Sequence, residues 1–248
     1  MRIILNCDDL GMSPAVNDAI LGLMEAGRVT SATLMPNGQA IEDAVRGLRH
    51  FPRCSFGVHL VGTEFRPLSS HPGLAPLLNE DGEFAGNLRS IQITPFIAAG
   101  MFSEWCAQMD RALALGVPIS HIDSHHHVHT EPRLFRMLKQ IQKKYRVRKI
   151  RISRNVYAPQ ENPSTQLRLT KNLWNFVLRN YIPTITTDWF TAFWTFYERL
   201  KAGLPCAGTI ELMCHPGSPL FTAETALLST NWKQELVPGA EMISYNQL

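Results

Sequence analysis

Cysteine is scarce in this sequence: there are five residues among 248, and no two of them form a C-x-x-C pair. An odd number of widely spaced cysteines indicates neither a disulfide framework nor a thiolate zinc site. We therefore expect free thiols, a reducing compartment and a cytoplasmic location. The cysteines are Cys7, Cys54, Cys106, Cys206 and Cys214.

Long apolar runs are missing as well. The chain passes from Arg2 through a short apolar run to Asp8 and Asp9, which is too brief for a signal peptide or a membrane-spanning helix. We expect no signal peptide and no transmembrane segment. There is also no internal repeat, linker or low-complexity tract, so we expect residues 1–248 to form one domain.

The sequence has no large excess of positive or negative charge. Its net charge is +3, and 18% of the residues are charged. This balance gives no reason to expect a nucleic-acid partner. The densest basic run spans residues 143–154, and we interpret it as a solvated helix end that passes into a strand rather than as a site for an anion or a membrane surface. Its basic residues are Lys143, Lys144, Arg146, Arg148, Lys149, Arg151 and Arg154.

What the sequence does have is a regular alternation of apolar strands and amphipathic helices, which predicts a parallel sheet with right-handed crossovers. About seven such units favour an α/β fold, a distorted or incomplete (β/α) TIM-like barrel, over an open doubly wound sheet. An irregular insertion over residues 62–94 is typical of a functional segment. The expected strands are 2–7, 31–35, 56–61, 121–129, 149–153, 184–190 and 209–214, and the expected helices are 13–27, 41–48, 95–115, 131–145, 167–180 and 193–201.

The segment from His121 to His129 contains five of the nine histidines. Read as one extended strand, it places its odd-numbered residues, Asp123 among them, on a single polar face. Such a face could bind a metal, because imidazole is a common metal ligand at neutral pH. The alternative is a polar strand end whose histidines bond only to water and backbone.

Polar side chains stand at the ends of four expected strands, namely Asp8 with Asp9, His59, His125 and His215. The carboxyl ends of parallel strands meet at one face, so these side chains are expected to converge there. Each residue alone has a structural alternative, as a helix cap, a strand histidine or a turn residue. Adjacent aspartates on a strand are expected to point to different sides, so that one binds metal and the other faces substrate. One carboxylate with two imidazoles leaves metal positions open for water and substrate, which favours metal-assisted hydrolysis.

Four ordered motifs resemble the signatures of the YdjC-like carbohydrate deacetylases, a family that includes chitooligosaccharide deacetylases and hopanoid-biosynthesis deacetylases. The resemblance covers most of the chain and is faint only around residues 155–205. The motifs are Asn6-x-Asp8-Asp9-Leu10-Gly11, Gly57-x-His59-Leu60, His121-x-Asp123-Ser124-His125-x-His127-x-His129 and Glu211-Leu212-Met213-x-His215-Pro216-Gly217.

The resemblance implies a distorted (β/α) barrel, a divalent ion that is Mg or Zn, and hydrolysis of an N-acetyl group from an amino sugar. It implies that Asp9, His59 and His125 bind the metal. It further implies that Asp8 is the general base and His215 the general acid. In the same scheme Asp123 orients a histidine, while His127 and His129 either line the cleft or have no role in the site.

The substrate is expected to be an N-acetylated sugar, either an oligosaccharide or a lipid-linked glycan. Residues 174–197 are dense in aromatic side chains, which are expected to pack in the core or, alternatively, to cover a sugar or an apolar aglycone.

Two other classes of function remain open. A phosphoesterase on the same barrel would need further metal ligands or basic residues at the strand ends, and neither is evident in the sequence. A catalytically silent carbohydrate-binding protein would have lost the ligands or Asp8, and all of these are present. A homodimer is a reasonable expectation for such a fold.

Overall fold

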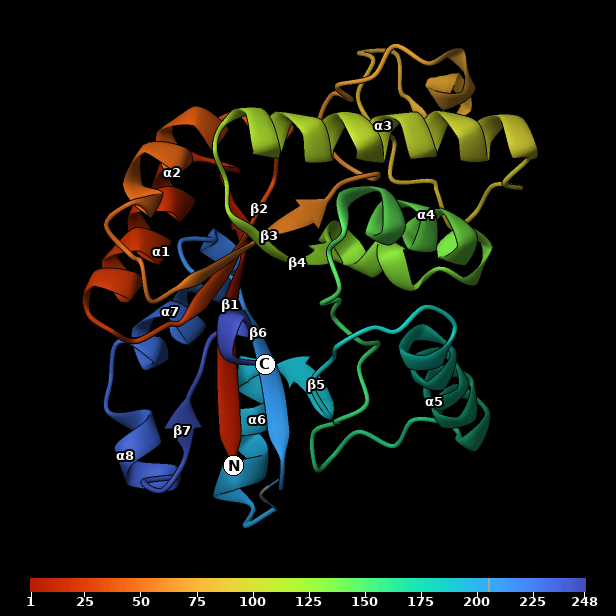
Figure 1. Ribbon diagram of the computed structural model, residues 1–248. Coiled ribbons are helices and arrows are strands. Elements are labelled where there is room, and N and C mark those ends of the chain that lie inside the picture. Colours follow the sequence, from red (N-terminus) through yellow and green to blue (C-terminus); the bar gives the residue numbers. More distant parts are fainter. Residues whose placement is uncertain (205) are drawn as a thin grey trace.

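Seven parallel strands and the helices that follow them form this protein in the computed structural model, which describes residues 1–204 and 206–248 (Figure 1). The strands are β1 (Arg2–Leu10), β2 (Ser31–Leu34), β3 (Ser55–Leu60), β4 (Ile119–Ser124), β5 (Trp189–Ala192), β6 (Thr209–Cys214) and β7 (Glu241–Met242). The α-helices are α1 (Pro14–Glu25), α2 (Ile41–Leu48), α3 (Pro95–Ala114), α4 (Phe135–Tyr145), α5 (Thr165–Asn180), α6 (Phe193–Lys201), α7 (Thr222–Leu228) and α8 (Trp232–Leu236). The expected α/β class is thereby confirmed.

The sheet has the strand order β4-β3-β2-β1-β6-β5, with β7 paired to β1, and all its pairs are parallel. Between β4 and β5 the ring continues only through isolated bridges, which join Ile122 to Ile150 and Lys149 to Ile185. The architecture is therefore an incomplete parallel barrel, as expected from the alternation in the sequence.

The expected strands 149–153 and 184–190 were wrong in extent. Backbone groups that a ladder would pair are bonded to side chains here. The carbonyl of Thr187 accepts from Arg179, and the N–H of Ser153 donates to the side chain of Asn175. Side-chain bonds that satisfy the backbone compete with strand pairing, so regular pairing begins only at β5.

Alternate residues of β1 face the helices and the barrel interior. Ile3 and Leu5 belong to the main apolar core, which packs under the helices, whereas Ile4 packs with Ile243 and Tyr245 inside the barrel. The next inward residue after Ile4 is Asn6, so the interior becomes polar toward the carboxyl end of the strands.

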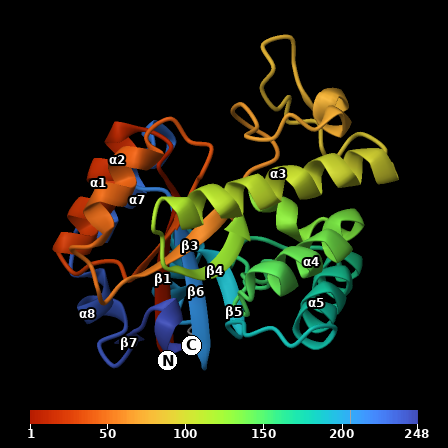
Figure 2. The same ribbon diagram turned by 45° about the horizontal axis from the view of Figure 1, so that its top comes forward.

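Helices α1 and α3 begin where the sequence predicts, because each has a hydroxyl N-cap followed by proline. The side chain of Ser13 accepts from the N–H of Val16, and that of Thr94 accepts from the N–H of Ile97. Figure 2 shows α3 crossing beside α4 and below the insertion that precedes it. On its inner face, the indole of Trp105 donates to the carbonyl of Val61, which fixes the end of β3.

The expected extended segment over residues 121–129 was wrong beyond Ser124. Strand β4 ends there, and His125–Thr130 forms a short 3-10 segment. Inside it, His126 and His127 have φ of 51° and 55°, in the left-handed region. Two residues in that conformation end the alternation of side chains, so the histidines do not share one face.

The C-terminal region adds β7 and helices that the sequence patterns did not predict. Strand β7 pairs with the beginning of β1, so the two ends of the chain lie side by side (Figure 1). This pairing carries Tyr245 into the amino end of the barrel. Pro205, which follows the expected helix 193–201 in the sequence, lies outside the described residues. Within the described part of the chain, we find no helix with the length and apolarity needed to cross a membrane.

A glycine in β3 marks a tight contact inside the barrel. A Cβ added to Gly57 would lie 2.6 Å from Cε1 of His121 and 2.7 Å from Cγ2 of Thr33. We predict that Gly57→Ala lowers the free energy of unfolding by about 1–3 kcal/mol through overpacking. The matched control is Gly22→Ala in α1, where nothing lies within 4 Å, and it should raise stability by up to ~1 kcal/mol. Urea unfolding midpoints measure both changes, and midpoints that shift in the same direction would contradict this account.

Candidate metal centre

An irregularity at the end of β1 brings two adjacent carboxylates to one place. The pairing of β1 with β2 shifts register between Cys7 and Leu10, and Asp9 has φ of 68°. As a result, Asp8 Oδ2 and Asp9 Oδ1 lie 4.0 and 3.3 Å from the same atom, Nε2 of His59. The expectation that these aspartates point to different sides was therefore wrong, because a bulge breaks strand alternation.

Three residues from three strand ends meet beside this bulge. Nδ1 of His125 lies 2.9 Å from Asp9 Oδ1, and Nε2 of His59 lies 3.3 Å from the same oxygen. One donor atom from each residue of this set lies within 4.8 Å of the others. All three are buried at the carboxyl ends of their strands. A carboxylate and two imidazoles in this arrangement fit a single divalent ion, with positions left over for water and substrate.

Each of the two histidines has a second carboxylate on its other ring nitrogen. Nδ1 of His59 donates to Asp123 over 2.7 Å, and Nε2 of His125 donates to Glu64 over 2.7 Å. Because a carboxylate only accepts, these bonds fix the tautomers and direct the remaining nitrogens toward Asp9. Such carboxylate–histidine pairs are the usual support of metal-binding histidines.

Glu64 was missed by the sequence reasoning, which treated the stretch after β3 as an irregular insertion. The available signal was its position three residues after the predicted strand 56–61, which carries His59. Its side chain is 45% exposed, so it also reaches the open side of the cluster.

The metal-free cluster holds protons. Burial disfavours the charged form of His59, but the carboxylates of Asp123 and Asp8 outweigh it and raise the pKa of His59 to about 10. Burial would also lower the pKa of His125, but its hydrogen bonds to the carboxylates of Asp9 and Glu64 have the larger effect and raise that pKa. For Asp9 burial would raise the pKa, yet the two histidines hold it well below the usual value. A divalent ion would replace the proton on the nitrogen of each imidazole that faces Asp9.

Asp8 is held by a fully buried arginine. The guanidinium of Arg151 donates to both oxygens of Asp8, each over 2.7 Å. It also lies 2.7 Å from Asp123 and donates over 2.7 Å to Glu211. Although burial alone would raise it, the pKa of Asp8 is lowered by the charge of Arg151.

The interpretation of residues 143–154 as a solvated run was therefore wrong for Arg151. The signal in the sequence was its place between Ile150 and Ile152, which are both fully buried. In a strand-like segment, a charged residue between two apolar ones faces the opposite side, which here is the polar barrel interior.

His215 follows β6 and lies near the carboxylates without a direct bond to them. Its backbone N–H donates to Glu224 over 2.7 Å, and its ring stacks on Phe221 with centroids 4.5 Å apart. Burial lowers the pKa of His215, while the charges of Asp8 and Asp9 oppose that shift.

The other histidines of residues 121–129 have different surroundings. His121 lies inside the barrel, stacked on Tyr245 with centroids 3.6 Å apart. His129 is buried and bonds to Ser124 and to the carbonyl of Arg151. His127, in contrast, lines a cavity, and burial lowers its pKa to about 3.

The aromatic segment 174–197 divides between core and surface. Trp174, Phe190, Phe193 and Phe196 are buried, whereas Phe176, Tyr181, Trp189 and Trp194 are exposed. Among the buried rings, that of Phe190 has its centroid 4.8 Å from Cζ of Arg151. Phe190 also lines the cavity beside His127.

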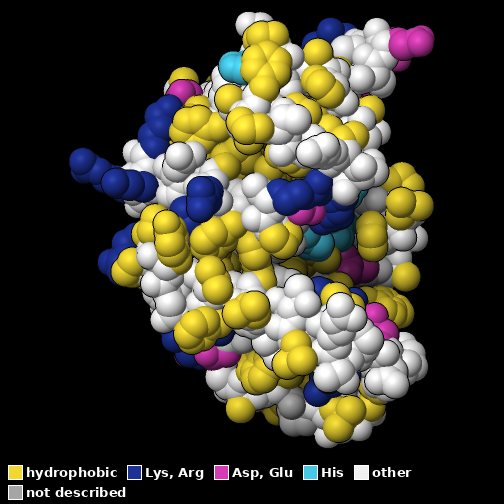
Figure 3. All heavy atoms as spheres, turned by 90° about the vertical axis from the view of Figure 1, so that its right-hand side faces the viewer, with side chains coloured by type: hydrophobic (Ala, Val, Ile, Leu, Met, Phe, Trp, Pro, Cys, Tyr) yellow, Lys and Arg dark blue, Asp and Glu magenta, His cyan; other side chains and the backbone are white. Residues whose placement is uncertain are grey.

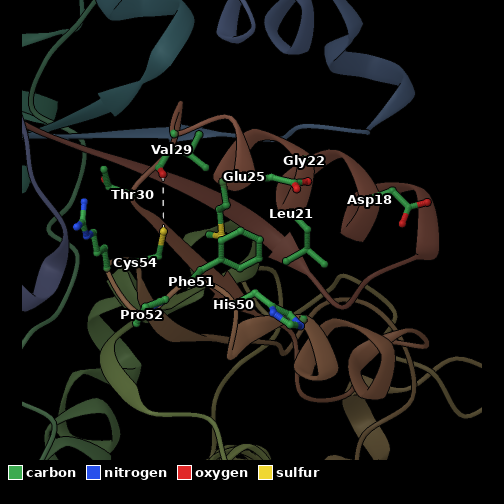
Figure 4. A pocket seen from close by; sticks show the side chains of 14 residues that line it. Asp18, Leu21, Gly22, Glu25, Val29, Thr30, His50, Phe51, Pro52 and Cys54 are labelled. Carbon is green, nitrogen blue, oxygen red and sulfur yellow. Dashed lines mark hydrogen bonds between the residues drawn. The ribbon is translucent and has the colours of Figure 1, made fainter.

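Two of the cavities differ in their distance from the candidate centre. Figure 3 shows histidine and acidic side chains within a hollow that Lys and Arg side chains border. A cavity of about 370 Å³ opens beside His127 and Met213, close to the candidate centre. A larger cavity of about 920 Å³ lies near the amino ends of β2 and β3, where Cys54 donates to the carbonyl of Val29 (Figure 4). The larger cavity contains none of the candidate site residues.

Comparisons with known proteins agree on one family. The sequence model described as YdjC-like protein matches residues 2–237. A carbohydrate deacetylase of Geobacillus stearothermophilus is 36% identical over 86% of this chain and 78% of its own length. A carbohydrate deacetylase of Oceanobacillus iheyensis is 31% identical over 88% of this chain and 86% of its own length.

Solved structures show the same fold. A protein from Enterococcus faecalis, named for cellobiose-phosphate cleavage, superposes with a TM-score of 0.78 at 23% identity, covering 99% of this chain and 98% of that one. A lactam utilization protein from Thermus thermophilus superposes with a TM-score of 0.53 at 15% identity, covering 98% of this chain and 100% of that one.

We predict that Glu64→Gln weakens binding of a divalent ion by about 10- to 100-fold, because His125 loses the charged partner that orients it. Isothermal titration with Zn²⁺ and Mg²⁺ measures the change. The matched control is Glu80→Gln, an exposed glutamate in the same insertion, which should bind as the wild type does. Equal affinities of the two variants would show that Glu64 does not support the centre.

We also predict that metal affinity rises with pH. Since His59 keeps its proton up to about pH 10 without metal, binding at neutral pH must displace that proton. The apparent affinity should rise by about tenfold per pH unit for each proton displaced. Folding raises the pKa of His59 from 6.5, so this contribution to the stability of the metal-free protein is lost as the pH rises from 6.5 to about 10. Titration in buffers of different ionisation enthalpy counts the protons, and a pH-independent affinity would contradict the prediction.

Proposed function

Given that the chain belongs to the YdjC-like family, we propose that it is an enzyme that hydrolyses the N-acetyl group of an amino sugar with the help of a divalent ion. The observation that carries this proposal is the pair of histidines around Asp9, each supported by a second carboxylate. The relatives named carbohydrate deacetylases supply the substrate class. In this proposal the substrate is an N-acetylated oligosaccharide or lipid-linked glycan.

In this proposal Asp9, His59 and His125 hold the ion. A divalent ion there supplies a Lewis acid that favours deprotonation of water and stabilises negative charge on the acetyl oxygen. An Asp-His-His set suits several ions, so we propose Mg or Zn as the cofactor. Asp123 and Glu64 keep the two imidazoles in the tautomers that point their free nitrogens at Asp9.

Asp8 is proposed as the general base. Its bonds to Arg151 keep the carboxylate ionised and fix its orientation at the edge of the centre. An ionised carboxylate can take a proton from the attacking water, and a fixed orientation keeps it within reach of that water. The same bonds lower the basicity of Asp8, so a bound divalent ion would have to supply the acidity of the attacking water.

His215 is proposed as the general acid that protonates the leaving amine. Burial lowers the pKa of His215, so the protonated ring is a stronger acid than a free imidazolium. The negative charges of Asp8 and Asp9 act in the opposite direction and favour the protonated ring. The C–N bond of the amide breaks readily only when the departing nitrogen is protonated. A histidine is suited to give that proton near neutral pH.

One argument against the phosphoesterase alternative no longer holds. The sequence showed no basic residues at the strand ends, yet Arg89, Arg154 and Lys171 line the cavity beside the centre. This removes one argument against a phosphoesterase, and the named relatives now support deacetylation over it. A silent carbohydrate-binding protein is disfavoured because the proposed ligands and Asp8 occur together.

Three further proposals concern the whole chain. A cytoplasmic location is supported by the five cysteines, which are all free. One domain over residues 1–248 is supported by a main apolar core that runs from Ile3 to Ala240. A homodimer stays a prediction.

We predict that Asp8→Asn lowers acetate release at least about a hundredfold while metal stays bound, because the proposed base is lost while Asp9, His59 and His125 remain. His125→Ala should lose both metal and activity. Acetate release from a panel of N-acetylated sugars, before and after metal removal and restoration, measures turnover, and elemental analysis measures bound metal. Asp18→Asn, an exposed aspartate on α1, is the matched control and should behave as the wild type. Normal acetate release from Asp8→Asn would refute its assignment.

A further inference from the structure

Helix α5 turns an apolar face toward solvent. Its buried face carries Trp174 and Leu178. Leu169, Leu173 and Phe176 follow one another at intervals of four and three residues, which places them together on the opposite side of the helix. Each of these three side chains is 63% exposed. A helix on a protein surface normally turns polar residues outward, so the outer face of α5 has the pattern of a surface that a partner covers.

The end of α5 adjoins basic residues of α4. Tyr181, which follows α5 directly, is 65% exposed, and its ring centroid lies 5.6 Å from that of Phe135 in α4. Tyr181 also lines a groove of about 270 Å³ together with Arg136 and Lys143 of α4. Both Figure 1 and Figure 2 show the two helices next to each other. Exposed apolar and basic side chains thus form one continuous surface, which Figure 3 views from outside.

This part of the chain carries most of the positive charge. Residues 132–187 contain 13 of the 24 Lys and Arg residues of the chain but only one of its 21 Asp and Glu residues, Glu161. The exposed basic residues of α4, α5 and the segment after α4 are Arg136, Lys143, Lys144, Arg146, Arg148 and Arg168. In the described part of the chain, none of them has a carboxylate within ion-pair distance. Charge complementarity therefore favours an anionic partner.

A second copy of this chain fits the surface poorly. Two copies that met through α5 would bring basic residues of one protomer against those of the other, and like charges repel. A stable interface also takes about 20–30 residues from each partner, far more than one row of apolar side chains provides. A lipid surface needs less, because a few inserted apolar side chains and several nearby charges suffice for reversible binding.

We infer that the outer face of α5 docks onto the surface of an anionic lipid bilayer. In this assignment Leu169, Leu173 and Phe176 enter the boundary between headgroups and acyl chains, while Arg136 and Lys143 face the anionic headgroups. The exposed part of the basic run 143–154 then belongs to a membrane surface, the alternative that the sequence pattern disfavoured. The docking does not depend on the proposed deacetylation.

Vesicle binding tests the assignment with the full chain and without any sugar. The two probes are vesicles of phosphatidylcholine alone and vesicles of an equal mixture of phosphatidylcholine and phosphatidylglycerol. We expect the mixed vesicles to bind at least about tenfold more tightly in a sedimentation assay, since each Lys or Arg near an anionic surface contributes about fivefold in affinity. The preference should shrink at high salt. Absence of binding to the mixed vesicles, or equal binding to both kinds, overturns the inference.

The apolar face is tested by substituting two exposed leucines. Leu169→Gln combined with Leu173→Gln should weaken binding to the mixed vesicles by about tenfold or more, because less apolar surface leaves water. Leu113→Gln is the matched control, since Leu113 is a 50% exposed leucine on α3, and it should bind as the wild type does. Thermal unfolding followed by circular dichroism verifies that both variants are folded. Unchanged binding by the folded double variant overturns the inference.

The basic residues are tested independently of the apolar face. Arg136→Gln and Lys143→Gln should each weaken binding to the mixed vesicles by about fivefold and reduce its dependence on salt. Arg53→Gln, an exposed arginine between α2 and β3, is the matched control and should leave both unchanged. Equal losses in all three variants would indicate attraction to the net charge alone and overturn the assignment to this surface.

Sedimentation equilibrium tests the other possible occupant. We expect the wild type and the double leucine variant to have the same oligomeric state, because the face binds lipid and not a second copy. A dimer that the leucine substitutions convert to monomers would assign the face to self-association and overturn the inference.

Discussion

A single buried arginine organises the interior of this barrel. Arg151 contacts carboxylates from three strands, namely Asp8 of β1, Asp123 of β4 and Glu211 of β6. All four groups are withdrawn from water, which is costly unless every charge is paired with good geometry. The contacts at 2.7 Å give each carboxylate a cationic partner and join different strands of an incompletely bonded sheet. Burial raises the pKa of Glu211 to about 7, which reduces the negative charge that the one guanidinium must offset. Arg151 itself lies in the segment between β4 and β5, where strand pairing is reduced to isolated bridges. Its ion pairs connect this segment to β4 and β6.

The network also sets the geometry of the candidate centre. Through Asp123 it fixes the ring of His59, and directly it fixes the carboxylate of Asp8. The remaining placement comes from the bulge at Asp9, whose left-handed backbone costs of order 1–3 kcal/mol and persists only because its surroundings hold it. Strain of this kind is typical of functional sites, where it directs a side chain that regular strand geometry would turn away.

Charge is divided between the centre and the cavity beside it. The centre concentrates carboxylates and imidazoles, whereas the cavity carries Arg89, Arg154 and Lys171. A cation in the centre would offset the negative charge of its carboxylates.

The sequence by itself determined the parallel α/β class, the starts of α1 and α3, and the convergence of Asp9, His59 and His125, because these depend on local periodicity and on the rule that strand ends meet at one face. Only the tertiary structure decided that Asp8 and Asp9 point together, that β4 ends before the last histidines, and that Arg151 and Glu64 support the centre. A bulge, a left-handed turn and a buried ion pair depend on neighbours distant in the chain. For that reason a basic run looked solvated in the sequence, although one member lies at the centre of the barrel and another on the wall of its cavity.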